Sequence, residues 1–248
     1  MLRKKDQGVE WLEFELFAEE SRLKHAIFLR HGGFSQPPYS ALNLGGGSGD
    51  DTASITKNRE KISRLLRVKG MISSHQVHGC EIGHVTDSSF EGHCDALVTA
   101  EKGIGLMIKH ADCQAAIFYD PIQNVLANVH AGWRGSVENI YAKTIDFLRE
   151  RYGSRPENLL VGISPSLGPE WAEFIHFRKE LPESFWGFQS KPTYFDFWAI
   201  SRAQLEEAGV LQGHIQVAGL CTYTEVRDFF SYRRDKVTGR NATVAMLN

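Results

Sequence analysis

Features that mark secreted, membrane-bound or nucleic-acid-binding proteins are scarce in this sequence. Only four of its 248 residues are cysteines, and no two of them form a C-x-x-C pair. Four cysteines are too few for a disulfide framework in a chain of this length. A cysteine that matters here is therefore expected to be a reduced thiol, acting either as a nucleophile or as a metal ligand.

Long apolar runs and an excess of one charge are also absent. No run approaches the ~20 apolar residues that cross a bilayer. Residues 1–20 mix basic, acidic and aromatic side chains and lack the unbroken apolar core of a secretory signal. We therefore expect a cytoplasmic protein without a membrane partner. The 28 Lys and Arg against 30 Asp and Glu give a formal net charge of -2, which gives no indication of a nucleic-acid partner.

What is present is the composition of an ordinary globular protein. Hydrophobic residues make up 42% of the chain and charged residues 23%. Domains commonly hold ~100–200 residues, so this length allows one or two of them. No convincing linker interrupts the sequence, and we expect a single domain over residues 1–248.

Apolar segments bounded by turn residues predict strands, and three further segments have the periodicity of helices. The predicted strands are residues 25–30, 95–99, 104–109, 115–120, 125–130, 159–164, 215–220 and 242–247. The predicted helices are residues 54–67, 136–152 and 197–208. Because strands come in runs as well as alternating with helices, the sequence predicts an α+β fold, an α/β sandwich of mixed β-sheets with helices packed outside them.

Capping residues indicate where two of the helices begin and end. The second predicted helix has Ser136 as its candidate N-cap and Gly153 at the C′ position. The third lies between Asp196 and Gly209, which suit the same two roles. The glycine-rich segment 43–51 is expected to be a loop.

Cys113 and His130 form the first candidate pair for chemistry. Cys113 precedes the apolar run 115–120, and His130 ends the apolar run 125–130. The intervening segment DPIQN has the composition of a turn. A hairpin with that turn would bring its two outer ends together, so Cys113 and His130 are expected to be neighbours in space.

The segment after His130 has features of an anion-binding helix start. Gly132 and Gly135 allow a tight turn, and a helix is expected to open at Ser136. Free backbone N–H groups at that start, with Arg134 nearby, would form a reasonable anion or phosphate site. The segment is not a Walker loop, since it has no G-K-[ST].

Two kinds of site remain open for this pair. In one, Cys113 is a nucleophile and His130 its base, as in cysteine hydrolases. In the other, both bind a metal such as zinc together with one more histidine, because three protein ligands and an open position are the pattern of catalytic zinc. The segment SSHQVHG (73–79) offers His75 and His78, which point to opposite faces of an extended chain and to one face of a helical turn.

Several blocks of residues resemble a known family. QVHG (76–79), ADC (111–113), HAGWRG (130–135) and FFSYRRDKVTGR (229–240) are similar to blocks of the YfiH-like, laccase-domain family. The resemblance extends over RHGGFS (30–35), ALNLG (41–45), GDD followed by Asn58 and Arg59, PSLGP (165–169), and Cys221 with Thr222. These blocks run in family order over nearly the whole chain. Members, once called multicopper polyphenol oxidases, are described as purine nucleoside phosphorylases.

The resemblance implies a zinc site formed by His78, Cys113 and His130, and a sandwich of mixed sheets. It implies phosphorolysis of adenosine, inosine and S-methyl-5'-thioadenosine to the free base and a ribose 1-phosphate, with adenosine deamination as a further activity. Copper and phenol oxidation belong to the older description of the family. Blue copper needs two His, one Cys and a weak axial ligand, and multicopper centres need many more histidines, so the sequence gives copper poor support.

Further residues of the matching blocks are expected to serve the reaction. We expect Asp112 to orient a ligand or to act as a base. The residues expected to contact phosphate or substrate are Arg30, Asn43, Arg59, Arg134, Arg233 and Arg240. The chain departs from the family pattern at His110, where a small or hydroxyl residue is usual, and at Ser164, where glycine is usual. Neither departure removes a proposed metal ligand, so they bear on substrate preference.

Overall fold

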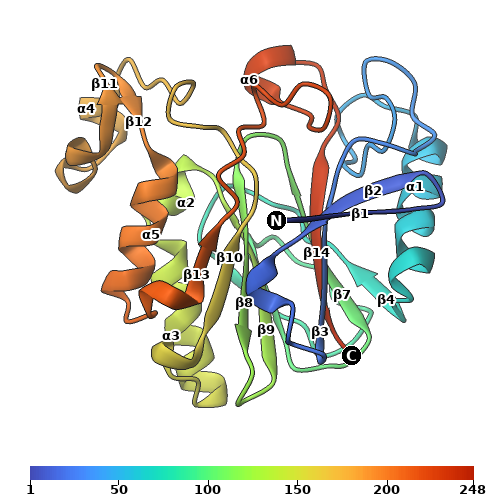
Figure 1. Ribbon diagram of the computed structural model, residues 1–248, viewed down its shortest axis with the longest axis horizontal. Coiled ribbons are helices and arrows are strands. Elements are labelled where there is room, and N and C mark those ends of the chain that lie inside the picture. Colours follow the sequence, from blue (N-terminus) through green and yellow to red (C-terminus); the bar gives the residue numbers. More distant parts are fainter.

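Two six-stranded β-sheets lie face to face in the computed structural model, which describes residues 1–248 (Figure 1). The first sheet has the strand order β1 (Leu2–Asp6), β2 (Val9–Glu13), β3 (Leu23–Phe28), β14 (Asn241–Leu247), β7 (Ile104–His110) and β4 (Gly70–Ile72). The second has the order β13 (Ile215–Val217), β10 (Leu160–Ile163), β8 (Gln114–Asp120), β9 (Val125–Ala131), β6 (Ala96–Thr99) and β5 (Ile82–His84). A short hairpin of β11 (Gln189–Lys191) and β12 (Tyr194–Phe195) belongs to neither sheet.

Both sheets are mixed. Most neighbouring strands run antiparallel, but β4 is parallel to β7, β5 to β6, and β13 to β10. This confirms the predicted α+β sandwich of mixed sheets. Each predicted strand segment contains a strand, whereas β1, β2, β4, β5 and the β11–β12 hairpin were not predicted. β1 is a charged edge strand with every residue exposed, and β4 and β5 are only three residues long, so none of them has a strong apolar pattern.

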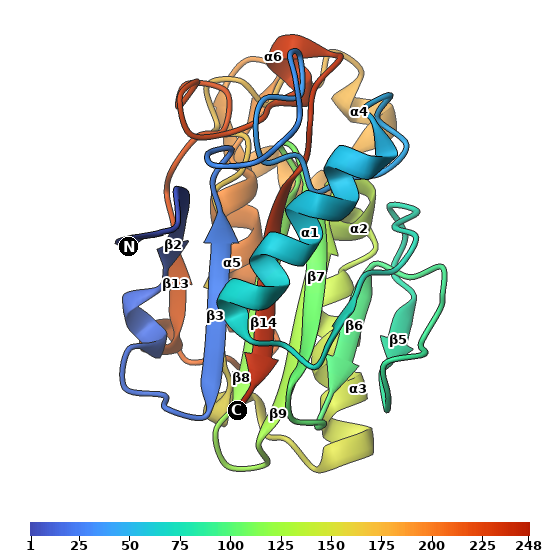
Figure 2. The same cartoon turned by 90° about the vertical axis from the view of Figure 1, so that its right-hand side faces the viewer.

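Helices cover the outer faces of both sheets, which gives four layers. α1 (Thr52–Leu66) lies across the first sheet, as Figure 2 shows, and packs Ile62 and Leu66 against it. α3 (Ile140–Tyr152) and α5 (Phe197–Glu207) cover the second sheet. Between the sheets, β3, β7 and β14 share one hydrophobic core with β6, β8 and β9. Each large apolar side chain buried there contributes roughly 1.5–3 kcal/mol of stability.

The helix predicted over 136–152 is instead two helices. α2 (Trp133–Val137) begins ahead of Ser136, and α3 follows after a break. At the break Asn139 has a left-handed backbone with φ 53°, and its side chain accepts a hydrogen bond from the Ala142 N–H at 3.2 Å. Asn139 is therefore the N-cap of the long helix, and the prediction of Ser136 in that role was wrong. The apolar periodicity runs across the break, which is why the pattern did not reveal it.

The other helix boundaries are close to the prediction. The Asp51 carboxylate accepts a hydrogen bond from the Ser54 N–H at the start of α1. Asp196 caps α5 in the same way by accepting from Ala199, and Gly153 ends α3 in the left-handed region with φ 69°. Two short helices, α4 (Phe177–Glu180) and α6 (Tyr232–Asp235), complete the fold.

A buried amide joins the two sheets. Asn128 in β9 donates through Nδ2 to the backbone carbonyls of Leu106 in β7 and Thr243 in β14, each at 2.9 Å. Asn128 is fully buried, so these bonds form in a low-dielectric core and fix one strand of each sheet relative to the other. Leu126, two residues before Asn128 and on the same face of β9, belongs to the hydrophobic core between the two sheets.

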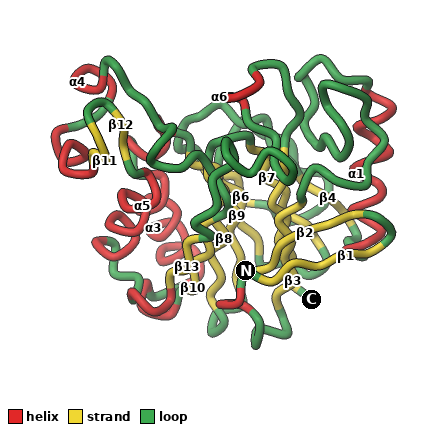
Figure 3. Tube along the Cα trace, turned by 45° about the horizontal axis from the view of Figure 1, so that its top comes forward, coloured by secondary structure: helices red, strands yellow, loops and turns green.

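Loops gather at the end of the sandwich that carries α6 (Figures 1 and 3). At this end of the sandwich His110, the last residue of β7, pairs with Asn241, the first residue of β14. β8 begins at the same end. The β11–β12 hairpin and α4 project to one side of it, and their aromatic side chains pack with Trp133 of α2. None of the helices has the length and apolar character that crossing a membrane requires.

Candidate metal centre and adjoining cavities

Three side chains from separate parts of the chain converge at the loop end of the sandwich. The ligand atoms of His78, Cys113 and His130 all lie within 4.8 Å of one another. The rings of His78 and His130 meet edge to face, with centroids 4.9 Å apart. The predicted hairpin of β8 and β9 accounts for two of the three, since Ala115 pairs with His130. The structure therefore brings together the residues that the family resemblance selected.

His75 is not a member of this group. Its backbone pairs with His93 in an isolated parallel bridge, and the two rings have centroids 4.8 Å apart. Beyond His75 the chain is no longer extended, and His78 has a left-handed backbone with φ 61°. The two histidines are thus separated by this turn, whereas the sequence left an extended chain and a helical turn both open.

The carboxylate of Asp95 fixes the turn that carries His78. It accepts hydrogen bonds from the backbone N–H groups of Val77, His78 and Gly79 at 3.1, 3.0 and 2.8 Å. Asp95 directly precedes β6 and is fully buried. Three N–H donors on one carboxylate stabilise its negative charge, and the same bonds hold the turn in place.

The same carboxylate orients His130. Oδ1 of Asp95 lies 2.8 Å from the ring nitrogen Nδ1 of His130. In addition, the backbone N–H of His130 donates to the backbone carbonyl of Asp95 at 2.6 Å. A histidine that donates from Nδ1 to a carboxylate keeps Nε2 free for a metal, as metal-ligating histidines commonly do. Sequence reasoning missed Asp95. The available signal was an acidic residue at the head of an apolar strand.

The charges in this group shift three pKa values. Burial raises the pKa of Asp95, but hydrogen bonds from His130 and Gly79 outweigh it and leave that pKa below the ordinary value. Burial lowers the pKa of His130, but Cys113 and Asp95 outweigh it and raise that pKa to about 9. Burial raises the pKa of the Cys113 thiol, but His130 and His78 lower it to about 6. Near neutral pH Cys113 is therefore a thiolate, the form that binds a metal and also the form that attacks as a nucleophile.

The surroundings of the three side chains fit a bound metal ion. A Cβ atom at Gly132 would lie 3.0 Å from Cδ2 of His78 and 3.4 Å from Sγ of Cys113, so a larger residue there would crowd the ligands. One thiolate sulfur and two imidazole nitrogens suit zinc, and three protein ligands leave a position for water or substrate. His130 is buried, Cys113 is half-buried and His78 is exposed, so the open side faces solvent.

Two cavities meet at this group. One, the aromatic cavity, has a volume of about 630 Å³ and is lined by Trp133, Arg134, Leu167, Phe174, Phe197 and Arg233. The other, the polar cavity, has a volume of about 500 Å³ and is lined by Gly45, Gly46, His75, Gln76, Lys109, His110 and Arg240. Four residues line both cavities, namely His78, Ala111, Cys113 and Tyr232. Both volumes fall within the range of roughly 300–1,000 Å³ found for small-molecule sites.

Three of the arginines expected to contact phosphate or substrate line these cavities. Arg134 and Arg233 line the aromatic cavity, and Arg240 lines the polar one. The guanidinium of Arg134 lies over the Trp133 ring at 4.9 Å from its centroid. Arg233 directs its guanidinium toward the Glu173 carbonyl, with the nearer nitrogen at 3.4 Å. All three residues therefore lie at the wall of a cavity that meets the His78, Cys113 and His130 group.

The remaining predicted residues hold loops and line neither cavity. Arg30 and Arg59 donate to backbone carbonyls, at Ser40 and Leu44 respectively. Asn43 is fully buried and accepts and donates hydrogen bonds within the glycine-rich loop that was predicted there. All three therefore support the loop that borders the polar cavity.

The anion site predicted at a helix start is not formed at Ser136. The Ser136 N–H donates to the Gly132 carbonyl at 2.9 Å, because the helix has begun earlier. α2 is also only five residues long, so its dipole is small. Of the residues named in that prediction, Gly132 and Arg134 line the aromatic cavity.

Both oxygens of the Asp112 carboxylate are engaged. Oδ1 accepts from the Thr222 hydroxyl at 2.7 Å, and Oδ2 accepts from the Arg233 N–H at 2.6 Å. Asp112 itself has a left-handed backbone with φ 90°. These bonds join the loop that carries Cys113 to the C-terminal block, so Asp112 is placed to position Arg233.

Lys109 is a cavity residue that sequence reasoning missed. Its Nζ donates to the Ser74 carbonyl at 2.9 Å and lies at the wall of the polar cavity. Burial, followed by the positive charge of Arg59, lowers its pKa to about 8. The signal that could have found it is a charged residue near the end of an apolar strand.

The two departures from the family pattern lie beside the site. His110 lines the polar cavity, with Nε2 3.0 Å from the Thr243 hydroxyl. The Ser164 hydroxyl accepts a hydrogen bond from the Ala115 N–H at 2.9 Å. His110 therefore shapes a cavity wall, whereas Ser164 acts on the backbone at the start of β8.

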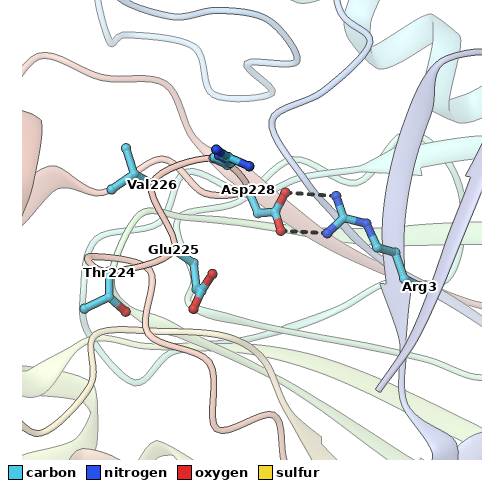
Figure 4. Close-up of a pocket in the computed structure, with 6 residues that line it drawn as sticks. Arg3, Thr224, Glu225, Val226 and Asp228 are labelled. Atoms are coloured by element: carbon cyan, nitrogen blue, oxygen red, sulfur yellow. Dashed lines mark hydrogen bonds and ion pairs between the residues drawn. The ribbon is translucent and has the colours of Figure 1, made fainter.

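A third hollow, of about 550 Å³, shares no lining residue with the other two. Figure 4 shows Arg3 facing Asp228 there through two contacts, at 2.7 and 2.9 Å. Burial raises the pKa of Asp228, but Arg3 outweighs burial and lowers it. The pair fastens the edge strand β1 to the loop that precedes α6, which is a structural role.

Comparison with known proteins gives relatives over most of the chain. The family model described as multi-copper polyphenol oxidoreductase laccase matches residues 24–248. Purine nucleoside phosphorylase YfiH of Shigella flexneri is 32% identical over 230 residues, which cover 88% of this chain and 91% of that protein. A purine nucleoside phosphorylase of Deinococcus radiodurans is 36% identical over 234 residues, which cover 91% of this chain and 89% of that protein.

Solved structures share the fold. The crystal structure of YlmD from Geobacillus stearothermophilus matches with a TM-score of 0.89 at 29% identity, covering 99% of this chain and 98% of that one. The crystal structure of Bacillus licheniformis hypothetical protein YfiH matches with a TM-score of 0.89 at 26% identity, covering 99% of both chains. The chain therefore belongs to the YfiH-like, laccase-domain family.

Proposed function

We propose that the protein is a zinc-dependent purine nucleoside phosphorylase. Its substrates would be adenosine, inosine and S-methyl-5'-thioadenosine, each cleaved by phosphate to the free base and a ribose 1-phosphate. Relatives named purine nucleoside phosphorylase support this reaction class. The observation that carries the proposal is the meeting of an aromatic and a polar cavity at His78, Cys113 and His130.

The aromatic cavity suits a purine base. Its wall holds Trp133 and Phe174 edge to face with ring centroids 6.0 Å apart, and the Phe197 ring centroid lies 5.3 Å from that of Phe174. Stacking of a base on such rings contributes about 1–3 kcal/mol per base. Arg134 and Arg233 add hydrogen-bond donors for the polar edge of the base. The base is therefore assigned to this cavity.

The polar cavity suits inorganic phosphate. Lys109 and Arg240 supply two positive charges to its wall, and Gly45 with Gly46 brings the backbone to its edge without side chains. Arginine binds phosphate oxygens through two parallel hydrogen bonds, and lysine binds them as a compact charge. Phosphate held here would lie on one side of the metal centre while the base lies on the other.

The ribose then lies at the junction of the cavities, beside Tyr232. Such a pose places the attacking phosphate and the departing base on opposite sides of the sugar, which is what a displacement at the anomeric carbon requires. His78, Cys113 and His130 would hold the zinc, and Asp112 would hold the segment of Arg233 against the base. When bound, zinc would supply positive charge near the reacting atoms and the hydrolytic chemistry that adenosine deamination requires.

A direct assay tests the reaction. Wild-type protein incubated with inosine and inorganic phosphate is expected to release hypoxanthine and ribose 1-phosphate in equal amounts. His130→Ala should lower kcat/KM by at least about 100-fold, because it removes a metal ligand and the partner of a buried carboxylate. Chromatography of both products measures this, with His176→Ala, at an exposed histidine that lines neither cavity, as the matched control that keeps activity.

Folding of the variant is checked by circular dichroism. If His130→Ala does not fold, the exposed His78 provides a second variant, His78→Ala, with the same expected loss. Base release that does not depend on phosphate, or an unchanged rate in a folded ligand variant, would contradict the proposal.

A second function is favoured by one observation. Cys113, His130 and Asp95 line up as thiolate, imidazole and carboxylate, which is the order of groups in a metal-free cysteine hydrolase. His78 distinguishes the two functions, because a hydrolase of this type needs no second histidine at the thiolate. Metal analysis of the purified protein therefore separates them.

Zinc is expected in the purified protein at about one ion per chain, as measured by elemental analysis. His78→Ala should lose most of it, since two ligands hold zinc far more weakly than three, and His75→Ala should keep it. A metal-free wild type that iodoacetamide alkylates selectively at Cys113 would favour the hydrolase. Copper in place of zinc would favour the polyphenol oxidase of the older family description.

Asp95→Asn should weaken zinc binding by about 10- to 100-fold, as loss of a partner of a ligating histidine typically does. The amide keeps the size of the side chain but lacks the charge that holds the Nδ1–H of His130 and the three backbone N–H groups. Competition with a chromophoric chelator measures the affinity. Asp146→Asn, at an exposed ion pair on α3, is the control, and equal affinities in the two variants would refute the role of Asp95.

Phosphate binding is expected to depend on the charge of Lys109. Its lowered pKa means that the ammonium is present below pH about 8 and is lost above it, so the KM for phosphate should rise as the pH passes upward through that value. Lys109→Arg stays charged over this range and should remove the rise. Steady-state kinetics measure it, with the exposed Lys102→Arg as control. A wild-type KM that is flat across this range would show that Lys109 does not bind phosphate.

A further inference from the structure

Cys80, Lys143 and Glu138 form a cluster outside the metal centre. Lys143 Nζ lies 2.7 Å from Cys80 Sγ, and the same sulfur lies 2.9 Å from Oε2 of Glu138. Nζ is 3.6 Å from that oxygen. None of these side chains lines either cavity, and the proposed phosphorolysis uses none of them. We name the three residues the thiol–amine cluster.

The contact between nitrogen and sulfur is unusually close. N–H···O hydrogen bonds span about 2.7–3.2 Å, and sulfur is a larger atom than oxygen. The Lys143 amine is thus already closer to the sulfur of Cys80 than the roughly 3–3.5 Å at which reacting atoms are held ready for attack. Once the sulfur is oxidised to an electrophile, Lys143 is in position to attack it as soon as its ammonium loses a proton.

We propose that Cys80 and Lys143 form a reversible covalent crosslink when the protein meets hydrogen peroxide. In the first step the sulfur attacks peroxide, the O–O bond breaks, a sulfenic acid forms and one water leaves. In the second step the ammonium of Lys143 first loses one proton through the Glu138 carboxylate to solvent. The free amine then attacks the sulfur, the S–O bond breaks, an S–N bond forms and a second water leaves with one amine proton. Sulfur is oxidised by two electrons and one peroxide is reduced, so the sum of thiol, amine and peroxide is the sulfenamide and two waters.

The cluster is open to a small oxidant. The side chains of Lys143 and Glu138 are 47% and 50% exposed, and Cys80 is half-buried between them. Cys94, by contrast, is buried. A sulfenic acid at Cys80 therefore forms beside an amine, which captures it before further oxidation.

Glu138 supplies the proton acceptor that both steps need. Its carboxylate lies within hydrogen-bond distance of the sulfur and next to the ammonium of Lys143. The reaction consequently depends on added peroxide and on the position of this carboxylate.

The crosslink would tie two functional parts of the fold together. Cys80 follows Gly79, whose N–H donates to Asp95, and lies two residues beyond the metal-binding His78. Lys143 lies in the first turn of α3. A bond between them fastens the turn that carries His78 to the helix that covers the second sheet. The device is a peroxide-sensitive link at the rim of the metal centre.

Peptide mass spectrometry of the peroxide-treated full-length protein tests the proposal. The expected product is a pair of peptides, one with Cys80 and one with Lys143, joined and lighter by two hydrogens than the reduced pair, and separated again by dithiothreitol. Cys80→Ser must abolish the linked pair. A linked pair that carries one additional oxygen would overturn the S–N bond in favour of an oxygen bridge, and absence of any linked pair would overturn the crosslink.

Lys143→Arg provides the second measurement, since it keeps the positive charge but removes the nucleophilic amine. Without capture by the amine, Cys80 should be oxidised further to sulfinic and sulfonic acids, which dithiothreitol does not reverse. The amount of these products should be roughly tenfold higher than in the wild type. Glu138→Gln should slow linkage without changing its site. Lys179→Arg, elsewhere on the surface, is the matched control. Equal irreversible oxidation of Cys80 in wild type and Lys143→Arg would refute capture by Lys143.

Discussion

The buried carboxylate of Asp95 is the constraint on which the site depends. A carboxylate in the interior costs several kcal/mol unless its charge is compensated, and here three backbone N–H groups and one imidazole compensate it. In return it fixes the left-handed turn at His78 and the ring orientation of His130. Two of the three candidate ligands thus take their positions from a single group, which places His78 and His130 in a fixed relation to each other.

The sandwich explains how that carboxylate reaches its partners. β8, β9 and β6 are neighbours in the second sheet, and Ala96 pairs with Val129, so the residues just before and just after this pair, Asp95 and His130, come together at the strand ends. The hairpin of β8 and β9 delivers Cys113 to the same edge. Asn128 fixes this central strand to the other sheet, so the edge is a rigid platform. His78 is the one candidate ligand on an irregular segment, and the hydrogen bonds of Asp95 to the backbone of that segment hold it in place.

Local patterns were enough for the parts of the fold that depend on local interactions. The β8–β9 hairpin, its turn and the neighbourhood of Cys113 and His130 follow from two apolar runs and a turn segment. The break at Asn139 does not follow, because apolar spacing continues across it. Asp95 and the aromatic side chains that line the aromatic cavity were missed, because the residues that they contact come from strands and loops distant in the sequence. Lys109 was missed for a different reason: a charged residue near the end of an apolar strand gives no indication of the cavity that it faces.

Electrostatics favour a cation at this edge of the sandwich. In the protein alone, the Cys113 thiolate and the Asp95 carboxylate carry two negative charges against one positive charge on His130, so the buried group has a net charge of minus one. A divalent ion held by His78, Cys113 and His130 would take the place of the His130 proton, and its two positive charges would balance the thiolate and the carboxylate. Burial penalises an unbalanced charge far more than a balanced one. A cysteine hydrolase would keep the charge imbalance and would give His78 no role. A zinc site would balance the charge and would use both histidines that Asp95 holds in place.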